Sequence, residues 1–583
     1  MRHRNIRPAT QERRHRHQCD RDARLLVRLA ANEIVPLLTR IAFLREQALY
    51  AVPMRVTGDA LAEATSLMNG LVHAGYFLSM YLEELADFAR SWDLGPDPET
   101  AGKLLELSAK VDKLWHHEFT MWRRLSGRRY PFALTIAHTF VMLVGMEPKK
   151  SLNFKVEGGK ALHGSIAVNA SKNGAMGLLC AALLNKGTTT LKNVPKIEEV
   201  HRIIEVFKSM GITIGWNGND VVVTPPETFS LETMNEESAR RTRSVLMLIG
   251  PLIHLLPSFR LPQSGGCKLG SRTVRPHFFA LEKFGVTIDT TDDYWEVSHN
   301  DLTPAEVIMY ESGDTATENA IMAAAKIPGT TVIKYASANY MVQDVCFFLE
   351  SLGVKIEGIG TTTLTITGKP EINEDVEYFV SEDPTDAMFY LAAAILTRSS
   401  ITIERAPIEF LEKELLTLEK MGFTYSIQNR YLSHNGKTKL VDIVTHVSEL
   451  TAPPDKVHSY PYPALNMDNL PFFAVIATQA KGTTLIHDWT YEKRAIYFTE
   501  LDKLGATTHL ADPHRIYIEG PTPLKAAELM CPPALRPATI LLIGMLAAPG
   551  TSILRNVYSI NRGYEDLATK LTSLGASVSL FEE

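Results

Sequence analysis

A repeated unit after residue 170 restricts the possible folds of this chain more than any other feature. Each copy contains an apolar helix, a Gly-Thr or Ser-Ser turn, a β-branched strand, an amphipathic helix that ends at a Gly, and a second strand. Clear copies span residues 187–213, 329–354, 399–423, 482–506 and 550–576, and a degenerate copy spans residues 258–286. Six such units predict an α/β protein.

The pattern inside the units predicts where their parts lie. The first helices are apolar on nearly every face and are expected to be buried; they include residues 175–184, 320–325, 388–396 and 540–548. The amphipathic helices are expected outside, each ending at a left-handed C-cap glycine. We expect two lobes of three units, with helices enclosed by sheets, and a single solenoid of six units is the alternative.

The first 150 residues have a different composition. Residues 1–21 form an arginine-rich basic tail that is expected to be disordered. Residues 22–145 place leucines at helical spacing, which predicts a small all-α module of unknown role. A boundary is expected at residues 146–150, after which β-branched runs dominate.

The composition indicates which kinds of partner and which cellular compartment to expect. The net charge of -6 over 583 residues gives no general reason to expect nucleic-acid binding. The cysteines are odd in number and scattered without metal-ligand spacing, which favours free thiols, a reducing cytoplasm and no metal; they are Cys19, Cys180, Cys267, Cys346 and Cys531. Residues 131–146 are apolar but shorter than the roughly 20 residues that a membrane span needs, so no span is expected. The oligomeric state is left open.

The stretch at residues 264–277 combines three glycines with reactive side chains. A thiol, Cys267, is followed by Arg272, Arg275 and His277. Nearby cations favour a thiolate, so Cys267 is a candidate proton donor or nucleophile. The alternative is a glycine-rich turn with an incidental cysteine.

Four features together resemble a known family. These are the six units, the early Ser171-Lys172-Asn173, the Gly-Gly-Cys loop in the second unit, and Asn561-Arg562-Gly563-Tyr564-Glu565 near the C-terminus. From about residue 146 onwards the chain resembles the enolpyruvyl transferases, and among them the UDP-N-acetylglucosamine 1-carboxyvinyltransferases. The resemblance implies a two-lobed inside-out α/β barrel with its active site between the lobes. The first lobe would be residues 172–381, and the second residues 146–171 plus 382–583.

The resemblance also implies an activity. The enolpyruvyl group of phosphoenolpyruvate would be transferred to the 3-hydroxyl of UDP-N-acetylglucosamine, with release of phosphate and without a cofactor. This is the first committed step of peptidoglycan synthesis.

Individual roles follow from the same resemblance. Cys267 would deliver a proton to the methylene carbon and would be the target of fosfomycin. Asp468 would take or orient the proton of the attacking hydroxyl, although an N-cap of the following helix is the alternative. Lys172 precedes an apolar helix whose first backbone N–H groups also favour anions.

The remaining candidates would bind substrate. Lys172, Arg272 and Arg562 would hold the phosphate of phosphoenolpyruvate, and Arg494 and Arg536 would face its carboxylate. Asn173, Arg243 and Asp383 complete the substrate-binding set. Residues 312–315 would bind the diphosphate of the nucleotide-sugar, where Asp314 is an unfavourable charge.

Several residues depart from the family pattern. Thr273, Arg275, Lys493 and Ala534 replace the usual residues beside the candidate cations and put substrate affinity in question. Two other functions compete with this one: a 3-phosphoshikimate enolpyruvyl transferase, a type of enzyme that lacks the cysteine loop, and a catalytically silent regulator that binds a nucleotide-sugar. In the favoured hypothesis the Cys267 loop is a lid that closes on bound ligand.

Overall fold

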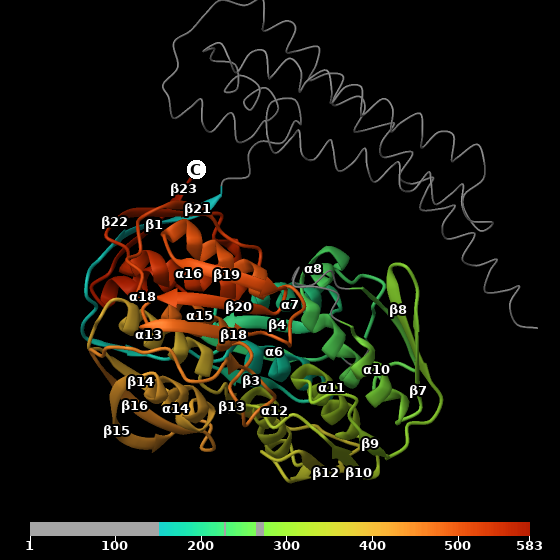
Figure 1. Ribbon diagram of the computed structural model, residues 1–583. Coiled ribbons are helices and arrows are strands. Elements are labelled where there is room, and N and C mark those ends of the chain that lie inside the picture. The colour runs from blue at the N-terminus through green and yellow to red at the C-terminus, as the bar shows by residue number, and fades with distance from the viewer. Residues whose placement is uncertain (1–150, 227–228, 264–272) are drawn as a thin grey trace, which may run out of the picture. The chain divides into compact units, whose positions relative to one another are not determined.

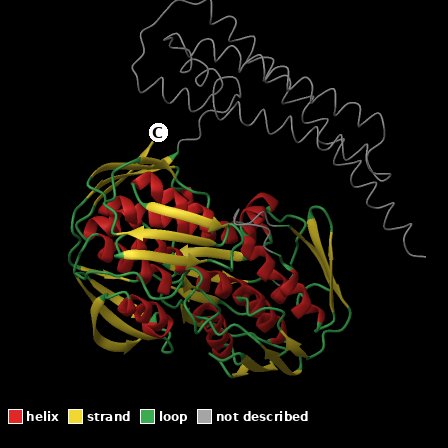
Figure 2. Ribbon diagram, in the orientation of Figure 1, coloured by secondary structure: helices red, strands yellow, loops and turns green. Residues whose placement is uncertain are grey.

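The computed structural model describes residues 151–226, 229–263 and 273–583. The chain divides between residues 149 and 150, and the second unit is the one described here. The predictions for residues 1–21 and 22–145, and those for Cys267 and Arg272, lie outside the described residues. The described unit is a mixed α/β fold (Figures 1 and 2).

Within the described ranges the strands form six sheets, three from each part of the chain. The first three, in order of hydrogen-bonded neighbours, are β13 (Val376–Phe379), β3 (Thr189–Lys192), β5 (Asp220–Thr224) and β4 (Thr213–Asn217); β6 (Ser258–Pro262), β8 (Tyr294–His299) and β7 (Val286–Thr290); and β11 (Lys355–Glu357), β12 (Thr363–Gly368), β10 (Gly329–Lys334) and β9 (Glu306–Ile308). The other three are β15 (Thr424–Leu432), β16 (Lys439–His446), β14 (Thr402–Pro407) and β2 (Ser165–Ala167); β17 (Val457–His458), β18 (Gly482–His487), β20 (Arg515–Gly520) and β19 (Thr507–Asp512); and β21 (Glu528–Met530), β22 (Gly550–Arg555), β1 (Leu152–Gly158) and β23 (Ser577–Glu582).

The helices accompany these sheets in chain order. They are α6 (Lys172–Ala181), α7 (Glu198–Ser209), α8 (Glu236–Arg241), α9 (Ile249–Leu252), α10 (Arg275–Glu282), α11 (Asp314–Ala324), α12 (Tyr340–Ser351), α13 (Pro384–Leu396), α14 (Glu412–Lys420), α15 (Leu470–Ala477), α16 (Leu535–Ala547), α17 (Tyr558–Asn561) and α18 (Leu567–Ser573). In the described ranges four 3-10 segments accompany them: η2 (Ala182–Leu184), η3 (Arg243–Leu248), η4 (Ile408–Phe410) and η5 (Ala495–Leu504).

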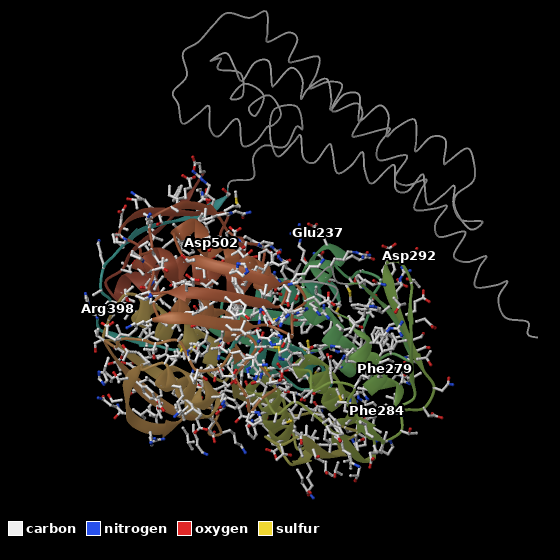
Figure 3. The ribbon with its side chains drawn as sticks, viewed as in Figure 1. Glu237, Phe279, Phe284, Asp292, Arg398 and Asp502 are labelled. Carbon is white, nitrogen blue, oxygen red and sulfur yellow. The ribbon has the colours of Figure 1, made fainter. Side chains whose placement is uncertain are left out.

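Two large hydrophobic cores underlie these sheets in the described part of the chain. One draws on residues between 170 and 380, with Phe410 added. The other combines residues 154–168 with residues between 387 and 578. We call the two bodies the first and second lobe. Charged side chains such as Glu237, Asp292, Arg398 and Asp502 are exposed at the periphery (Figure 3).

The apolar helices are buried, as their composition predicts. Every residue of α15 is buried, and α13 and α16 are buried along almost their whole length. Cys180 and Cys346 are fully buried core residues. The amphipathic helices α14 and α18 bury one face each, which also agrees with the prediction.

Helix α12 contradicts the expectation that the second helix of each unit lies outside. Eight of its 12 residues are buried, because it packs against α6. Its polar residue Asp344 has buried partners: the Tyr378 hydroxyl donates to it at 2.6 Å and the Ser381 amide at 3.1 Å. Burying this helix therefore places a carboxyl group inside the first lobe.

The glycine that ends the amphipathic helix of each unit has the predicted left-handed backbone. The values of φ lie between 84° and 96° at Gly211, Gly285, Gly353, Gly422, Gly505 and Gly575. A residue with a Cβ is strained in this conformation, which explains why Gly recurs there.

A second set of glycines ends strands, and the sequence pattern did not single it out. Gly158, Gly368 and Gly520 pair across the ladder with Gly550, Gly329 and Gly482. A Cβ at any of the first three would overlap carbonyl oxygens at or just beyond the ends of α16, α11 or α15. The close approach lets the chain after the strand bond to carbonyls of the same helix ends: Gly159 N donates to Leu546 O, and Lys369 N to Ala325 O, both at 2.8 Å. The sheets thus satisfy the C-terminal carbonyls of the buried helices.

The chain crosses between the lobes at two adjacent points. Ala170 and Glu382 form an antiparallel bridge. Ser171 N donates to Ser381 O at 2.7 Å, and Asp383 N donates to Asn169 O at 2.8 Å. The first lobe therefore begins and ends at the same place.

In the residues described, no helix combines the length and the apolar character needed to cross a membrane.

Candidate active site

A cavity of about 530 Å³ is lined by residues of both lobes. Seven of the predicted site residues line it: Lys172, Asn173, Arg243, Asp468, Arg494, Arg536 and Arg562. Asp383 is not among the lining residues; its side chain caps α13 by accepting from Thr385 N at 2.8 Å. Cys267 and Arg272 fall in the range that the structure does not describe, although the adjacent Thr273 lines the cavity.

Lys172 is the first residue of α6. The Ser171 hydroxyl caps this helix by accepting from Gly174 N at 2.9 Å. Burial lowers the pKa of Lys172, and the cations Arg562 and Arg536 lower it further, while Glu199 opposes them. An ammonium group in this position is stabilised by a negatively charged ligand.

Glu199, on α7 of the first lobe, contacts Arg562 of the second lobe. Its carboxylate accepts from the Arg562 guanidinium and, at 2.9 Å, from the Thr242 hydroxyl. Burial by itself raises the pKa of Glu199, but Lys172 and Arg562 outweigh it, so the pKa is lowered and the carboxylate is charged. Sequence reasoning missed this residue, although a charge on the apolar face of α7, beside Val200 and Ile203, was an available signal.

Asp468 lies between groups from both lobes. Its Oδ2 accepts from Asn173 Nδ2 at 3.4 Å and is 3.7 Å from Arg536 Nη2. The N-cap alternative is wrong, because the N-cap of α15 is Asn469 and the helix has no side-chain cap. The Asp468 carboxylate is therefore not used for capping.

Arg494 and Arg536 are both buried but differ in their partners. Arg494 is 1% exposed, pairs with Asp488, donates to Met467 O at 2.7 Å and stacks on Tyr491 with 4.1 Å to the ring centroid. Burial alone lowers the pKa of Arg494, but Asp488 outweighs it and the pKa is raised. Arg536 is 6% exposed and donates to the Tyr564 hydroxyl at 3.0 Å, while its Nε has no partner. Arg494 is therefore held by the protein, and Arg536 keeps unused hydrogen-bonding capacity.

The first-lobe wall is organised around His277. Nδ1 of this buried ring accepts from Asn319 Nδ2 at 3.1 Å, and Nε2 is 3.2 Å from the Thr315 hydroxyl. The amide of Asn319 is itself fixed because its Oδ1 accepts from Gly250 N at 2.7 Å. Arg243 Nη2 donates to Thr273 O at 3.1 Å, which ties this wall to the residue that follows the undescribed loop.

The segment at residues 312–315 lines the cavity at the start of α11. The Asp314 carboxylate accepts from the Ser337 hydroxyl at 2.6 Å and from Asn339 Nδ2 at 3.2 Å. These donors stabilise the charge that the sequence analysis found unfavourable here.

Glu318 is a lining residue that the sequence analysis missed. It is 1% exposed, and its Oε1 has no hydrogen-bond partner. Burial, with Asp314 and Asp344, raises its pKa well above the ordinary value, because the charged carboxylate is poorly solvated there and faces other carboxyl groups. Space for it comes from Gly177 of α6, where a Cβ would lie 2.6 Å from Oε1.

The structure also shows where the residues that depart from the family pattern lie. Arg275 is the exposed first residue of α10, Lys493 is exposed beside Arg494, and Ala534 is the buried N-cap of α16. His, Cys, Asp and Glu residues of the described ranges form no group of three or more placed to hold a metal ion.

The arrangement suits the binding of an anion with several negative charges. Five cationic side chains from both lobes line the cavity. Arg562 is paired with Glu199 and Arg494 with Asp488, and the Asp468 carboxylate lies beside Arg536. Cations in a partly dry cavity stabilise charge more strongly than they would in water.

Comparisons with known proteins show which proteins this chain resembles. Residues 156–571 match the family described as EPSP synthase (3-phosphoshikimate 1-carboxyvinyltransferase). The UDP-N-acetylglucosamine 1-carboxyvinyltransferase of Treponema denticola is 32% identical over 429 residues, which cover 73% of this chain and 99% of the relative. That of Bradyrhizobium diazoefficiens is 33% identical over 435 residues, with 74% and 99% covered.

Solved structures share the fold. The enolpyruvyl transferase NikO from Streptomyces tendae superposes with a TM-score of 0.64 at 24% identity, over 74% of this chain and 100% of its own. The EPSP synthase of Acinetobacter baumannii gives a TM-score of 0.59 at 16% identity, over 74% and 100%. The fold, the matched region and the extent of the sequence similarity agree: this chain belongs to the UDP-N-acetylglucosamine 1-carboxyvinyltransferase family of enolpyruvyl transferases.

Proposed function

We propose that this protein transfers the enolpyruvyl group of phosphoenolpyruvate to the 3-hydroxyl of UDP-N-acetylglucosamine and releases phosphate, the first committed step of peptidoglycan synthesis. The observation that carries the proposal is the cavity between the lobes, which cations of both lobes line together with the Asp468 carboxylate. The names of the relatives support the choice of substrates.

The chemistry divides between the lining residues. Lys172 and Arg562 bind the phosphate of phosphoenolpyruvate, and Arg536 binds its carboxylate. Arg494, which is held by Asp488, supports the same wall. Asp468 takes the proton of the sugar hydroxyl as its oxygen attacks the central carbon, while the methylene carbon gains a proton from Cys267. In the elimination step the bond between the central carbon and the phosphate oxygen breaks, phosphate leaves, and a proton returns from the methyl carbon to the Cys267 thiolate.

The proposed architecture is an inside-out α/β barrel in two lobes, residues 172–381 and residues 146–171 plus 382–583. The two separate hydrophobic cores and the burial of α11, α13, α15 and α16 support it. The proposal retains Asn173, Arg243, Arg272 and Asp383 as substrate-binding residues, residues 312–315 as the diphosphate site, the Cys267 loop as a fosfomycin-sensitive lid, and a cytoplasmic location.

Phosphate release tests the proposal. The purified full chain is incubated with phosphoenolpyruvate and either UDP-N-acetylglucosamine, shikimate 3-phosphate or no acceptor. We expect phosphate release only in the mixture that contains UDP-N-acetylglucosamine as the acceptor. Phosphate release only when shikimate 3-phosphate is the acceptor would instead favour the 3-phosphoshikimate 1-carboxyvinyltransferase activity. No phosphate release with either acceptor would favour a catalytically silent protein that binds a nucleotide-sugar.

Replacement of Cys267 tests the assignment of the acid. General acid catalysis contributes about 10²–10⁴-fold, so Cys267→Ser is expected to lower kcat within that range. The unfolding midpoint in urea serves as the control and is expected to stay unchanged. A kcat equal to that of the unsubstituted protein would remove Cys267 from the mechanism.

A further inference from the structure

Trp489 is an aromatic residue of the cavity wall that has no role in the proposed chemistry. It follows β18 in the second lobe and is 42% exposed. A large aromatic ring gains more from being covered than most side chains do, so this exposure leaves a favourable contact unmade. A ligand in the cavity can make that contact.

Two contacts fix the orientation of the Trp489 ring. Its Nε1 donates to the carbonyl oxygen of Ser459, a residue that is fully buried. The indole also packs against Tyr460 with 5.4 Å between ring centroids, and Tyr460 packs against His458 at 4.9 Å. The ring is therefore held in place without a ligand, which lowers the entropy cost of stacking on it.

The neighbours of Trp489 indicate which part of a ligand reaches it. Residues 490–492 also line the cavity, and Arg494 of the same segment donates to Met467 O at 2.7 Å. This bond places the segment beside Asp468, the proposed base for the sugar hydroxyl. A base lies within hydrogen-bond reach of the hydroxyl that it deprotonates, so the sugar ring that carries this hydroxyl lies against the same wall.

We infer that Trp489 is a specificity-determining residue, whose ring stacks on the pyranose ring of the acceptor. The faces of a pyranose carry C–H groups, which are apolar and pack on an aromatic ring. The uracil ring is not the expected occupant, because the proposed diphosphate site, residues 312–315, belongs to the first lobe. The inference rests on the proposed function for the place of the acceptor, and on the contacts above for the fixed ring.

Two replacements of Trp489 test the stacking by the shape of the side chain. Trp489→Leu keeps an apolar group but has no flat face, whereas Trp489→Phe keeps an aromatic face. The affinity for UDP-N-acetylglucosamine, measured by calorimetric titration, is expected to fall about 10-fold in Trp489→Leu and about 3-fold in Trp489→Phe. Equal losses in the two variants, or no loss in either, would overturn the inference.

Titration with UDP separates the sugar from the nucleotide. UDP has no pyranose ring, so its affinity is expected to be the same for the unsubstituted protein and for both Trp489 variants. If the affinity for UDP falls as much as the affinity for UDP-N-acetylglucosamine, Trp489 acts on the nucleotide or on the cavity as a whole, and the pyranose contact is refuted.

Tryptophan fluorescence gives a readout that a purely structural role would not change. Stacking alters the surroundings of the indole, so saturating UDP-N-acetylglucosamine is expected to change the emission of the unsubstituted protein. This change should be largely lost in Trp489→Phe, and its full persistence there would count against the contact. If Trp489→Leu does not fold, this measurement decides the question.

Trp216→Phe is the matched control for the fluorescence change. Trp216 lies in β4 and packs against His201 with 5.6 Å between ring centroids, and it is not among the residues that line the cavity. This variant should keep both the affinity for UDP-N-acetylglucosamine and the change in emission.

Measuring binding and phosphate release together separates this inference from the proposed function. If the unsubstituted protein binds UDP-N-acetylglucosamine but releases no phosphate, the proposed activity fails, while the Trp489 variants still test the contact. If phosphate is released and the variants bind the acceptor as tightly as the unsubstituted protein, the inference fails and the activity stands. An unsubstituted protein that does not bind UDP-N-acetylglucosamine would overturn both.

Discussion

Glu199 joins two cations that are proposed to hold one phosphate. Its carboxylate bonds to Arg562 across the lobes and favours the charged form of Lys172, whose pKa burial lowers. Glu199→Gln removes that support, so the pKa of Lys172 falls further and the ammonium is lost at a lower pH. We expect phosphoenolpyruvate to bind roughly 10-fold more weakly than to the unsubstituted protein at alkaline pH, with a smaller difference at acidic pH.

The measurement is the pH dependence of the KM for phosphoenolpyruvate. Glu198→Gln is the control, because the neighbouring Glu198 pairs with Arg202 on the surface of α7. A loss of affinity that is equal at both pH values would mean that Glu199 acts through Arg562 alone.

The site residues that could be predicted from the sequence are those that belong to a short local motif. Lys172 and Asn173 follow a helix-capping serine, and Arg562 belongs to a short motif; the structure brings all three to one cavity. His277 was named within the glycine-rich stretch, but nothing there indicated its bond to Asn319. Glu199 and Glu318 were missed because their environment comes from other segments: Glu199 from Arg562, and Glu318 from Gly177 on α6. Their local sequences resemble ordinary helix surfaces, so the spacing along the chain did not reveal them.

At the scale of the element, the glycines that end strands lead to a testable prediction about stability. Gly368 has no strained φ, but a Cβ there would overlap the carbonyl oxygen of Ile327, just beyond the end of α11. Gly368→Ala should separate β12 from that helix and lower the free energy of unfolding by about 1–3 kcal/mol.

Gly215→Ala is the matched change, because Gly215 also lies in a strand and a Cβ there would meet nothing within 4 Å. It should alter stability by less than about 0.5 kcal/mol. Urea unfolding of the two variants provides the comparison, and equal losses would contradict the explanation.

The buried helix α12 predicts a dependence of stability on pH. Burial raises the pKa of Asp344 to about 6, despite the hydrogen bonds from Tyr378 and Ser381. In the unfolded chain the pKa is about 3.9, so between these values the folded state binds more protons and stability falls as pH rises. The difference corresponds to about 3 kcal/mol.

Asp344→Asn should therefore flatten the stability curve between pH 4 and pH 7. Urea unfolding at several pH values measures it, with the unsubstituted protein as the reference. Parallel curves for the two proteins would show that Asp344 does not titrate in this range.

Helical periodicity predicted most elements but failed for α12. An amphipathic pattern indicates one apolar face, and α12 has such a face. The pattern carries no information about a polar residue that finds a buried partner, as Asp344 does with Tyr378. The distinction between an outer and an inner helix depended on the tertiary structure.

At the scale of the molecule, the repeats predicted an α/β protein of six units, and the described chain has six sheets. The repeats alone left open whether these units form two lobes or one solenoid. In the structure, β2 pairs with β14 and β1 pairs with β22, so two short segments before the first lobe complete sheets of the second. Nothing in the local sequence of β1 specifies so distant a partner.

The pairing of β1 has a consequence for synthesis on the ribosome. All strands of the first lobe have been made once β13 emerges, whereas β1 must wait for β22, which begins at Gly550 (Figure 1). At about 5–20 residues per second this delay is roughly 20–80 s. During this interval the backbone N–H and C=O groups of β1 have no partner strand, and an unpaired strand of this kind can be bound by a chaperone.

Nascent chains stalled between β16 and α15 should therefore contain a protease-resistant first lobe and a cleavable segment around β1. Chains released at full length should protect both regions. Protection of β1 in the stalled chains would show that it finds another partner first.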